Sequence, residues 1–265
     1  PGFISFAKGL KYFIYLYLLK PLNVFLTQIP WWYTMTVFII IGYVTVGLRF
    51  ATITAILLAF IGATGMWMHS MITLSSVLVS VLICFVIGVP LGVLASYNKW
   101  YRDIQNVVLD AMQTLPYFCY LIPVLMFFGG NIVSAVIATV IYSVPPIIRL
   151  TALGLSQVSS GYSEVSKSFG GTGIQTLNKV KFPLAVPSLV MGFNQTVIMA
   201  FAMQIVTPLI GGKGLGLQVF NALQRSDTGR GLSAGLAIVL LAIIIDRITH
   251  AWTKKQRQAL GLDQS

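Results

Sequence analysis

Charged side chains are scarce in this chain of 265 residues, of which 9% are charged and 57% are hydrophobic. Soluble domains carry about 25% charged residues. A water-soluble fold has no means of hiding so much apolar surface. The composition therefore excludes a soluble globular protein and predicts an all-α membrane protein with several spans.

The chain contains only two cysteines and two histidines. Cys84 and Cys119 both lie in apolar runs, where we expect small buried hydrophobic side chains rather than a disulfide. His69 and His250 lie at the ends of predicted spans. Nothing has metal-ligand spacing, and no Ser/His/Asp set or carboxylate pair indicates catalysis. We expect no catalytic residue, no metal and no cofactor bound by this chain.

Acidic residues are also few, six against 17 basic ones, which gives a formal net charge of +11. In a soluble protein this excess would suggest a nucleic-acid partner. In a membrane protein it indicates Lys and Arg held in cytoplasmic loops, so we expect no nucleic acid.

About seven stretches are long and apolar enough to cross a bilayer, which takes about 20 residues each. They are residues 31–48, 51–68, 72–96, 107–128, 132–150, 187–210 and 232–252. Prolines predict kinks or breaks in the fourth stretch, at Pro116, and in the fifth, at Pro145 and Pro146. The aromatic segment 3–19, stopped by Lys20-Pro21, is predicted to lie in the membrane interface, with an eighth span as the alternative.

These stretches suggest one membrane domain with additions. We expect an interfacial segment (1–30), two accessory spans (31–68), a core (69–252) and a cytoplasmic tail (253–265). Because most basic residues then fall on the side of the C-terminus, the N-terminus is predicted outside and the C-terminus in the cytoplasm.

The least apolar long stretch, 162–187, falls on the cytoplasmic side of this topology. It predicts a short helix, a glycine turn and a second short helix whose apolar face carries Ile174, Leu177 and Val180. Pro183 and Pro187 are expected to end that second helix. A plain amphipathic loop is the alternative.

The letters "EVSKSFGGTGIQTLNKVKFP" (164–183) resemble the signature loop of ABC-importer permeases: EAA, three residues, G, nine residues, I, one residue, L, P. The residues at the named positions are Glu164, Val165, Ser166, Gly170, Val180, Phe182 and Pro183. Stretches 109–129, 144–155, 192–206 and 246–252 look like the branch that includes glycine betaine and proline betaine permeases. The similarity runs from about residue 30 to 252.

This resemblance implies a type I ABC-importer core of five helices. It implies a permease subunit for glycine betaine or a related quaternary amine or osmolyte, such as choline, carnitine or trimethylamine N-oxide. A permease for another solute class, such as an amino acid, and a membrane scaffold without transport are the alternatives.

The resemblance also implies partners: two cytoplasmic ATPase subunits that carry ATP and Mg, a second permease copy in a homodimer, and an extracytoplasmic binding protein in a bacterial inner membrane. The loop 161–183 would couple to the ATPase. Phe169 is suited to an apolar slot, Glu164 to a basic group, and Gly170 to a tight turn. The segment "GGKGLG" (211–216) is no Walker A loop, because no Ser or Thr follows the Lys. We expect it to form an outer turn where the binding protein docks.

Polar residues within spans are costly and tend to face a cavity or a partner helix. The candidate translocation path comprises Tyr117, Tyr120, Asn194, Gln195, Met199, Met203 and Gln204. The tyrosines offer aromatic faces to a quaternary ammonium, with ordinary packing as the alternative. For the polar residues the alternative is helix–helix hydrogen bonding, and Gly88 with Gly92 predicts close helix packing. Asp110 lies near a cytoplasmic span end; Arg149 and Asp246 are expected to be interfacial anchors or partners for the ATPase.

Overall fold

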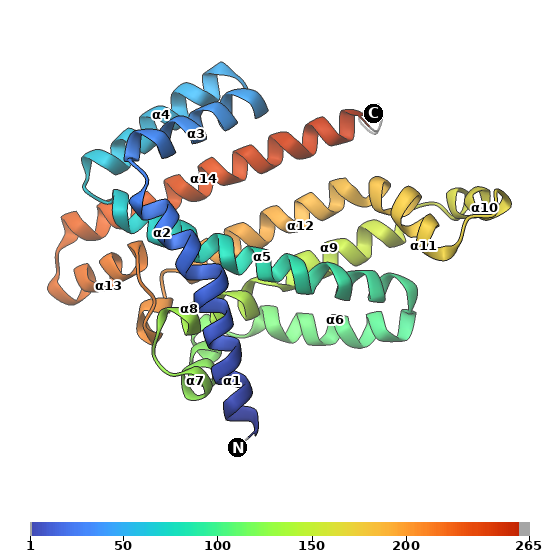
Figure 1. Cartoon of the computed structure of the whole chain (residues 1–265), viewed down its shortest axis with the longest axis horizontal. Coiled ribbons are helices and arrows are strands. Elements are labelled where there is room, and N and C mark those ends of the chain that lie inside the picture. Colours follow the sequence, from blue (N-terminus) through green and yellow to red (C-terminus); the bar gives the residue numbers. More distant parts are fainter. Residues whose placement is uncertain (1, 260–265) are drawn as a thin grey trace. The chain divides into compact units, whose positions relative to one another are not determined.

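The computed structural model describes the backbone of residues 2–259 and the side chains of residue 5 and residues 7–251. This part of the chain is built from helices and turns and contains no strand, so the all-α prediction is confirmed (Figure 1). The helices are α1 (Gly2–Phe13), α2 (Lys20–Gln28), α3 (Trp31–Thr45), α4 (Leu48–Ala63), α5 (Trp67–Tyr97), α6 (Lys99–Thr114), α7 (Tyr117–Phe128), α8 (Ile132–Ser143), α9 (Pro145–Ser156), α10 (Ser160–Ser168), α11 (Gly173–Thr176), α12 (Phe182–Met203), α13 (Leu215–Arg225) and α14 (Thr228–Ala259). Two π-helical segments, Ile14–Leu19 and Leu177–Lys181, and a 3₁₀ turn, Thr207–Ile210, complete the sequence of elements.

The chain divides into two compact units, and each is built from several segments. The first unit comprises Pro1–Ile83, Leu115–Ser143 and Val197–Ile248. The second unit comprises Cys84–Thr114, Val144–Thr196 and Thr249–Ser265. The last residues of the predicted tail, 260–265, lie outside the described residues.

Four described helices are long and apolar enough to cross a membrane. They are Trp67–Tyr97, Ile132–Ser156, Gly173–Met203 and Thr228–Ala251. Two bent pairs raise this number to six if each pair is one span, Ala7–Gln28 with Trp31–Thr45 and Lys99–Thr114 with Tyr117–Phe128. The expected seven spans are therefore four to six by length and composition among the described residues. The predicted spans 31–48 and 51–68 became helices of only 15 and 16 residues.

The predicted span 107–128 is broken at Pro116, whose extended backbone separates α6 from α7. Pro116 forces this break because it stands directly before α7 and disfavours helical geometry in the residue before it. The predicted interruption at Pro145 is milder, since α8 ends at Ser143 and α9 begins two residues later.

Pro21, Pro183 and Pro187 were expected to end helices but lie inside them instead, Pro21 in α2 and the other two in α12. Pro21 follows the π-helical segment Ile14–Leu19, and Pro183 follows the segment Leu177–Lys181. In each case the residue before the proline bonds five residues back, from Lys20 N–H to the Tyr15 carbonyl and from Phe182 N–H to the Leu177 carbonyl. A proline ring collides with the carbonyl four residues back in a regular α-helix. The wider π turn places that carbonyl differently, so both helices continue.

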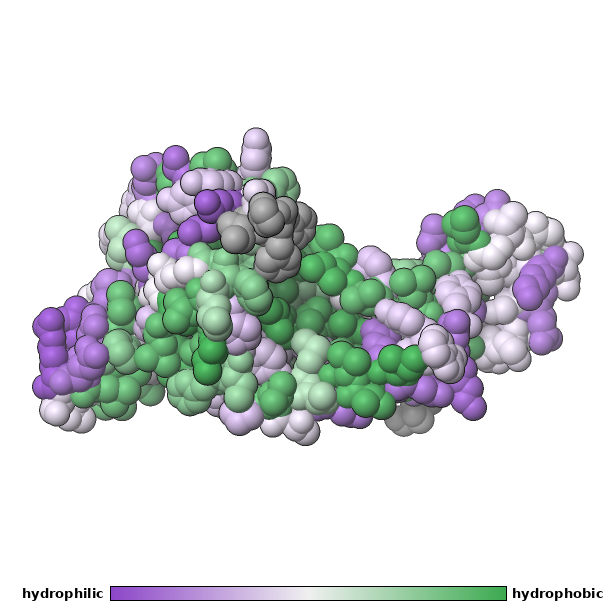
Figure 2. Space-filling model, turned by 90° about the horizontal axis from the view of Figure 1, so that it is seen from below, coloured by the Kyte–Doolittle hydropathy of each residue, from purple (hydrophilic) through white to green (hydrophobic). Residues whose placement is uncertain are grey.

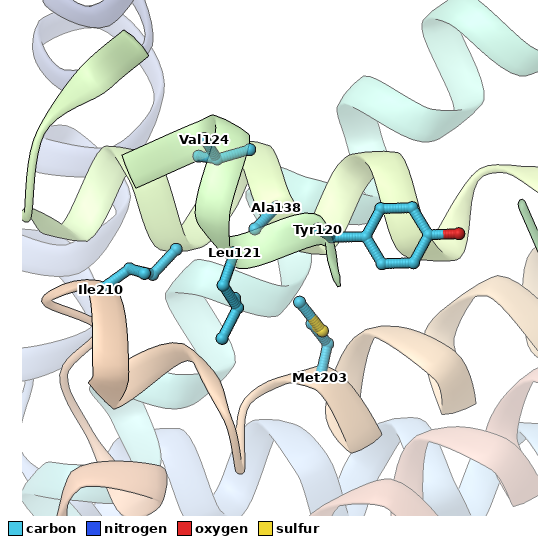
Figure 3. Packing of buried hydrophobic residues seen from close by; sticks show 6 residues of the cluster. All are labelled: Tyr120, Leu121, Val124, Ala138, Met203 and Ile210. Atoms are coloured by element: carbon cyan, nitrogen blue, oxygen red, sulfur yellow. The ribbon is translucent and has the colours of Figure 1, made fainter. Parts of the chain in front are cut away.

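The N-terminal helix packs within the first unit. Ile14 and Leu19 are buried against Val79 of α5 and Val133 and Val136 of α8. Helices α3 and α4 form a neighbouring antiparallel hairpin (Figure 1). A further cluster joins α7, α8, the end of α12 and the 3₁₀ turn Thr207–Ile210 (Figure 3). Its members are Tyr120, Leu121, Val124, Ala138, Met203 and Ile210.

Glycines allow close helix contacts in the second unit. A Cβ on Gly88 would lie 2.4 Å from the Ile147 side chain of α9, and one on Gly92 would lie 2.7 Å from the Ile148 carbonyl oxygen. Elsewhere on α9, a Cβ on Gly154 would lie 2.6 Å from Cβ of Ser188 in α12. The predicted close packing at Gly88 and Gly92 is confirmed.

Hydrophobic side chains cover much of the face shown in Figure 2, as expected for a surface that meets lipid or other subunits. Cys84 is buried as predicted, but Cys119 is exposed. The prediction for Cys119 was wrong because an apolar run in a membrane protein has an outward side as well as an inward one. Neither cysteine forms a disulfide.

Candidate coupling loop and translocation path

Helix α10 ends in a turn that only glycine fits well. Gly170 has a φ of +78°, in the left-handed region. Its N–H donates to the Lys167 carbonyl at 2.9 Å, and the N–H of Gly171 donates to the Ser166 carbonyl at 2.9 Å. These two bonds form a Schellman motif, which satisfies the last carbonyls of a helix and reverses the chain.

The turn is connected to the next helix by side-chain hydrogen bonds. The Thr172 hydroxyl accepts from the Gln175 N–H, and the Gln175 side chain accepts from the Thr172 N–H, which makes a capping box. The hydroxyls of Ser166 in α10 and Thr176 in α11 lie 2.8 Å apart. Thr176 is only 4% exposed, so the contact between the two short helices is shielded from water. These bonds therefore hold the two short helices and the turn together in one defined conformation.

Apolar side chains stand out from this loop. Phe169 is 90% exposed and Ile174 is 74% exposed, and Val165 and Glu164 are exposed as well. The prediction that Ile174 packs with Leu177 and Val180 was wrong: only the latter two are half-buried. The capping box starts the helix at Gly173 and thereby turns Thr176 inward and Ile174 outward. Phe169 and Ile174 give the loop an apolar tip.

The second short helix does not stop before the next span. α11, the π-helical segment and α12 form one helix of 31 residues, Gly173–Met203. Val180 and Phe182 are half-buried on it, and Pro183 is exposed. Lys181 places its Nζ 5.2 Å from the ring centre of Tyr97 at the end of α5. The second half of the loop is thus continuous with a long helix.

Two of the path candidates belong to a cluster of three tyrosines in the first unit. The ring of Tyr142 in α8 lies edge-to-face against both Tyr117 and Tyr120 of α7, with ring centres 5.3 and 5.9 Å away. Figure 3 shows the Tyr120 ring pointing away from Leu121 and Val124. Tyr117 is 47% exposed. Sequence reasoning missed Tyr142, because it lies on a different span from the other two.

Met203 and Gln204 follow at the end of α12, also in the first unit. Met203 is buried beside Tyr120 (Figure 3). Nε2 of Gln204 donates to the Thr139 hydroxyl at 3.2 Å. Its Oε1 is buried and has no hydrogen-bond partner among the described residues. Thr139 and Tyr142 are three residues apart on α8 and so share a face of that helix.

The remaining path candidates do not join this cluster. Asn194 lies in the second unit and accepts a hydrogen bond from the Thr249 hydroxyl of α14, so the helix–helix alternative applies to it. Gln195 is exposed in the same unit. Met199, in the first unit, is half-buried.

The glycine turn 211–216 is closely packed in the first unit. A Cβ on Gly216 would lie 1.9 Å from the Gln204 carbonyl oxygen, and Gly214 approaches Thr73 of α5. The Leu215 N–H donates to the Thr73 hydroxyl at 2.8 Å. Nearby, Gln218 links His69 to Arg230, at 3.3 Å from His69 Nδ1 and 3.0 Å from Arg230 Nε. The turn is thus a rigid connection with Lys213 exposed on it.

Residues 88–258 match the family described as "binding-protein-dependent transport system inner membrane component". The chain belongs to this family. It is a permease of an ABC importer, a transport component, and a multi-pass protein of the inner membrane. Transport systems of this family work with ATPase and substrate-binding partners.

Several relatives are similar over most of the chain. The glycine betaine/proline betaine transport system permease protein ProW of Escherichia coli is 40% identical over 241 residues, 91% of this chain and 68% of that protein. The glycine betaine/carnitine transport permease protein GbuB of Listeria monocytogenes is 45% identical over 191 residues, 72% of this chain and 68% of that protein. The recognition of the family and of its quaternary-amine branch from the loop and its neighbouring stretches is confirmed.

Among solved structures, an inward-facing form of the MetNI methionine ABC transporter matches with a TM-score of 0.63 and 23% identity. The match covers 69% of this chain and 92% of that one. It confirms the predicted type I importer fold.

Proposed function

We propose that this chain is the permease subunit of an ATP-driven importer of glycine betaine or a related quaternary amine, such as choline, carnitine or trimethylamine N-oxide. The relatives support this proposal, because the names of those at about 40% identity repeatedly include glycine betaine as the transported solute. A trimethylamine N-oxide permease of Ruegeria pomeroyi, 32% identical over 98% of this chain, extends the cargo class. The likeness to a methionine transporter supports the fold only.

The loop 161–183 is proposed to receive the movement of the ATPase. Phe169 fills an apolar slot on the partner, and Glu164 meets a basic group. The exposed apolar tip supports this role, because several exposed apolar side chains on one polar loop are typical of an interaction site. Val165 and Ser166 lie with Glu164 in α10. Val180, Phe182 and Pro183 lie at the junction of the π-helical segment and α12.

The proposed assembly contains two ATPase subunits, which hold ATP and Mg, and two copies of this chain around one path. A binding protein delivers the cargo from outside. This chain binds no cofactor. Its N-terminus lies outside and its C-terminus in the cytoplasm, as the distribution of basic residues supports.

The cluster of Tyr117, Tyr120 and Tyr142 is proposed to line part of the path. Aromatic faces attract a quaternary ammonium, which has no N–H group to donate in a hydrogen bond. The unpartnered Oε1 of Gln204 supplies a further negative dipole in the same unit. Asn194, Gln195, Met199 and Met203 remain further candidates. A weak site of this kind suits transport, because tight binding would slow release.

The first experiment reconstitutes the chain with its ATPase and binding protein in liposomes and measures ATP-dependent uptake of glycine betaine. Phe169→Ala is expected to reduce co-purification of the ATPase and to abolish uptake. Leu223→Ala is the matched control, because Leu223 is 74% exposed on α13, outside the loop. A scaffold without transport is supported instead if wild type shows no ATP-dependent uptake of any cargo tested.

The cargo is tested separately by competition binding to the cognate binding protein. Glycine betaine, choline, carnitine and trimethylamine N-oxide compete against methionine. Preference for methionine would overturn the amine assignment and leave the permease assignment intact.

A further inference from the structure

A charged cavity lies between α6 and α9 in the second unit, and no residue of the coupling loop or of the tyrosine cluster lines it. Its volume is about 450 Å³. One face of each helix lines it, because the residues recur at helical spacing. Those that give it its chemistry are Arg102, Asn106 and Asp110 of α6 and Arg149, Leu153 and Ser156 of α9.

The charges in this cavity are not balanced. Arg149 Nη2 pairs with Asp110 Oδ1 at 2.7 Å, and Arg102 adds a second positive charge. Nε of Arg149 is buried and has no hydrogen-bond partner among the described residues. A buried donor without an acceptor costs about 1–3 kcal/mol. The cavity thus holds one excess positive charge, an unused donor, and the further polar groups of Asn106 and Ser156.

Neighbouring residues place the cavity at the depth of lipid headgroups. Trp100 is 74% exposed and Tyr97 is 56% exposed, at the junction of α5 and α6. Exposed Trp and Tyr side chains mark the membrane–water interface. Arg102 lies within the same turn of α6 as Trp100. Val107 on that helix and Leu153 of α9 are exposed hydrophobic side chains suited to acyl chains.

We propose that this cavity binds the phosphate of an anionic phospholipid headgroup. A phosphodiester carries one negative charge, which matches the excess charge of the cavity, and its oxygens accept from Arg102 and from Nε of Arg149. Asp110 competes with the phosphate for Arg149. The bound lipid would hold α6 against α9, whichever solute the transporter carries.

The test measures binding of phosphatidylglycerol and phosphatidylcholine to the full chain in detergent, by native mass spectrometry and by thermal stability. Phosphatidylglycerol is expected to be retained and to raise Tm above the value with phosphatidylcholine. Arg102→Gln is expected to weaken phosphatidylglycerol about fivefold, the usual effect of one basic residue. Lys99→Gln, which removes a charge on the same helix outside the cavity, is expected to change it less than twofold.

Asp110→Asn separates binding from loss of structure. The amide keeps an oxygen for Arg149 and removes the competing charge, so phosphatidylglycerol is expected to bind about fivefold more tightly. Unchanged or weaker binding in this variant would overturn the proposal. So would equal effects of Arg102→Gln and Lys99→Gln. Inorganic phosphate is the last arm: if it alone reproduces the rise in Tm and both lipids act alike, the site takes a soluble anion and the lipid assignment fails.

Discussion

The turn after α10 allows a graded test of the coupling loop. Gly170 has a φ of +78° and nothing within 4 Å of the position a Cβ would take. Gly170→Ala therefore meets no clash and costs only the left-handed conformation, about 1–2 kcal/mol. That free energy lowers the population of the closed turn about 5–30-fold. Gly170→Asn is expected to lie between glycine and alanine, since Asn tolerates this conformation better.

A side chain at the next position, Gly171, would clash with Ser166. A Cβ on Gly171 would lie 2.6 Å from Ser166 Oγ and 2.8 Å from the Ser166 carbonyl oxygen. The hydroxyl can rotate away, but the carbonyl accepts the hydrogen bond that closes the turn. Gly171→Ala is thus expected to disturb the loop more than Gly170→Ala. Gly173→Ala is the matched control, because its Cβ meets nothing within 4 Å and alanine favours a helix.

Two readouts apply to this series in the assembled transporter. Hydrogen exchange at the Gly170 and Gly171 amides reports closure of the turn, and cargo-stimulated ATP hydrolysis reports coupling. Closure of the turn and cargo-stimulated ATP hydrolysis are both expected to decrease in the order Gly173→Ala, Gly170→Asn, Gly170→Ala, Gly171→Ala, with Gly171→Ala the most affected. If Gly170→Ala loosens the turn while coupling stays as in the Gly173 control, the turn is not needed for coupling and the reasoning is refuted.

Three further substitutions test other parts of the structure. Gly216→Ala places a Cβ 1.9 Å from the Gln204 carbonyl and is expected to prevent folding, as measured by the yield of monodisperse protein; Gly235→Ala, which meets nothing within 4 Å, should behave as wild type. Tyr142→Leu is expected to raise the KM of amine uptake about fivefold, the value of one cation–π contact, whereas Tyr142→Phe keeps the ring; equal effects would refute a cation–π role. Thr172→Ala removes the capping box and should lower the local stability of the loop by about 1 kcal/mol, read as faster exchange at the Gln175 amide; unchanged exchange would contradict this.

The class of protein and the coupling loop could both be predicted from the sequence, because both depend on local patterns. Apolar runs predict spans, and the spacing from Glu164 to Pro183 lies within one continuous segment. The same local rules failed at Pro21 and Pro183, where a π turn before each proline removes the collision that normally ends a helix. No residue in these segments signals a π turn, so the prolines alone predicted that each helix would stop.

Contacts between distant segments were beyond local patterns. Arg149 and Asp110, which are 39 residues apart in the chain, form a pair between α9 and α6, and Tyr142 meets Tyr117 across the turn between α7 and α8. Each residue has an ordinary place on its own helix. Only the packing of α6 on α9, and of α7 on α8, gives them a shared site.

The glycine-rich segments 170–173 and 211–216 have similar sequences, but their glycines are needed for different physical reasons. Gly170 has open space around it, so its role is conformational and a larger residue is tolerated at the cost of the left-handed backbone. Gly216 is buried against a carbonyl, so its role is steric and no side chain fits. The first kind of glycine suits a segment whose surroundings are completed by a partner. The second suits a fixed connection inside the chain.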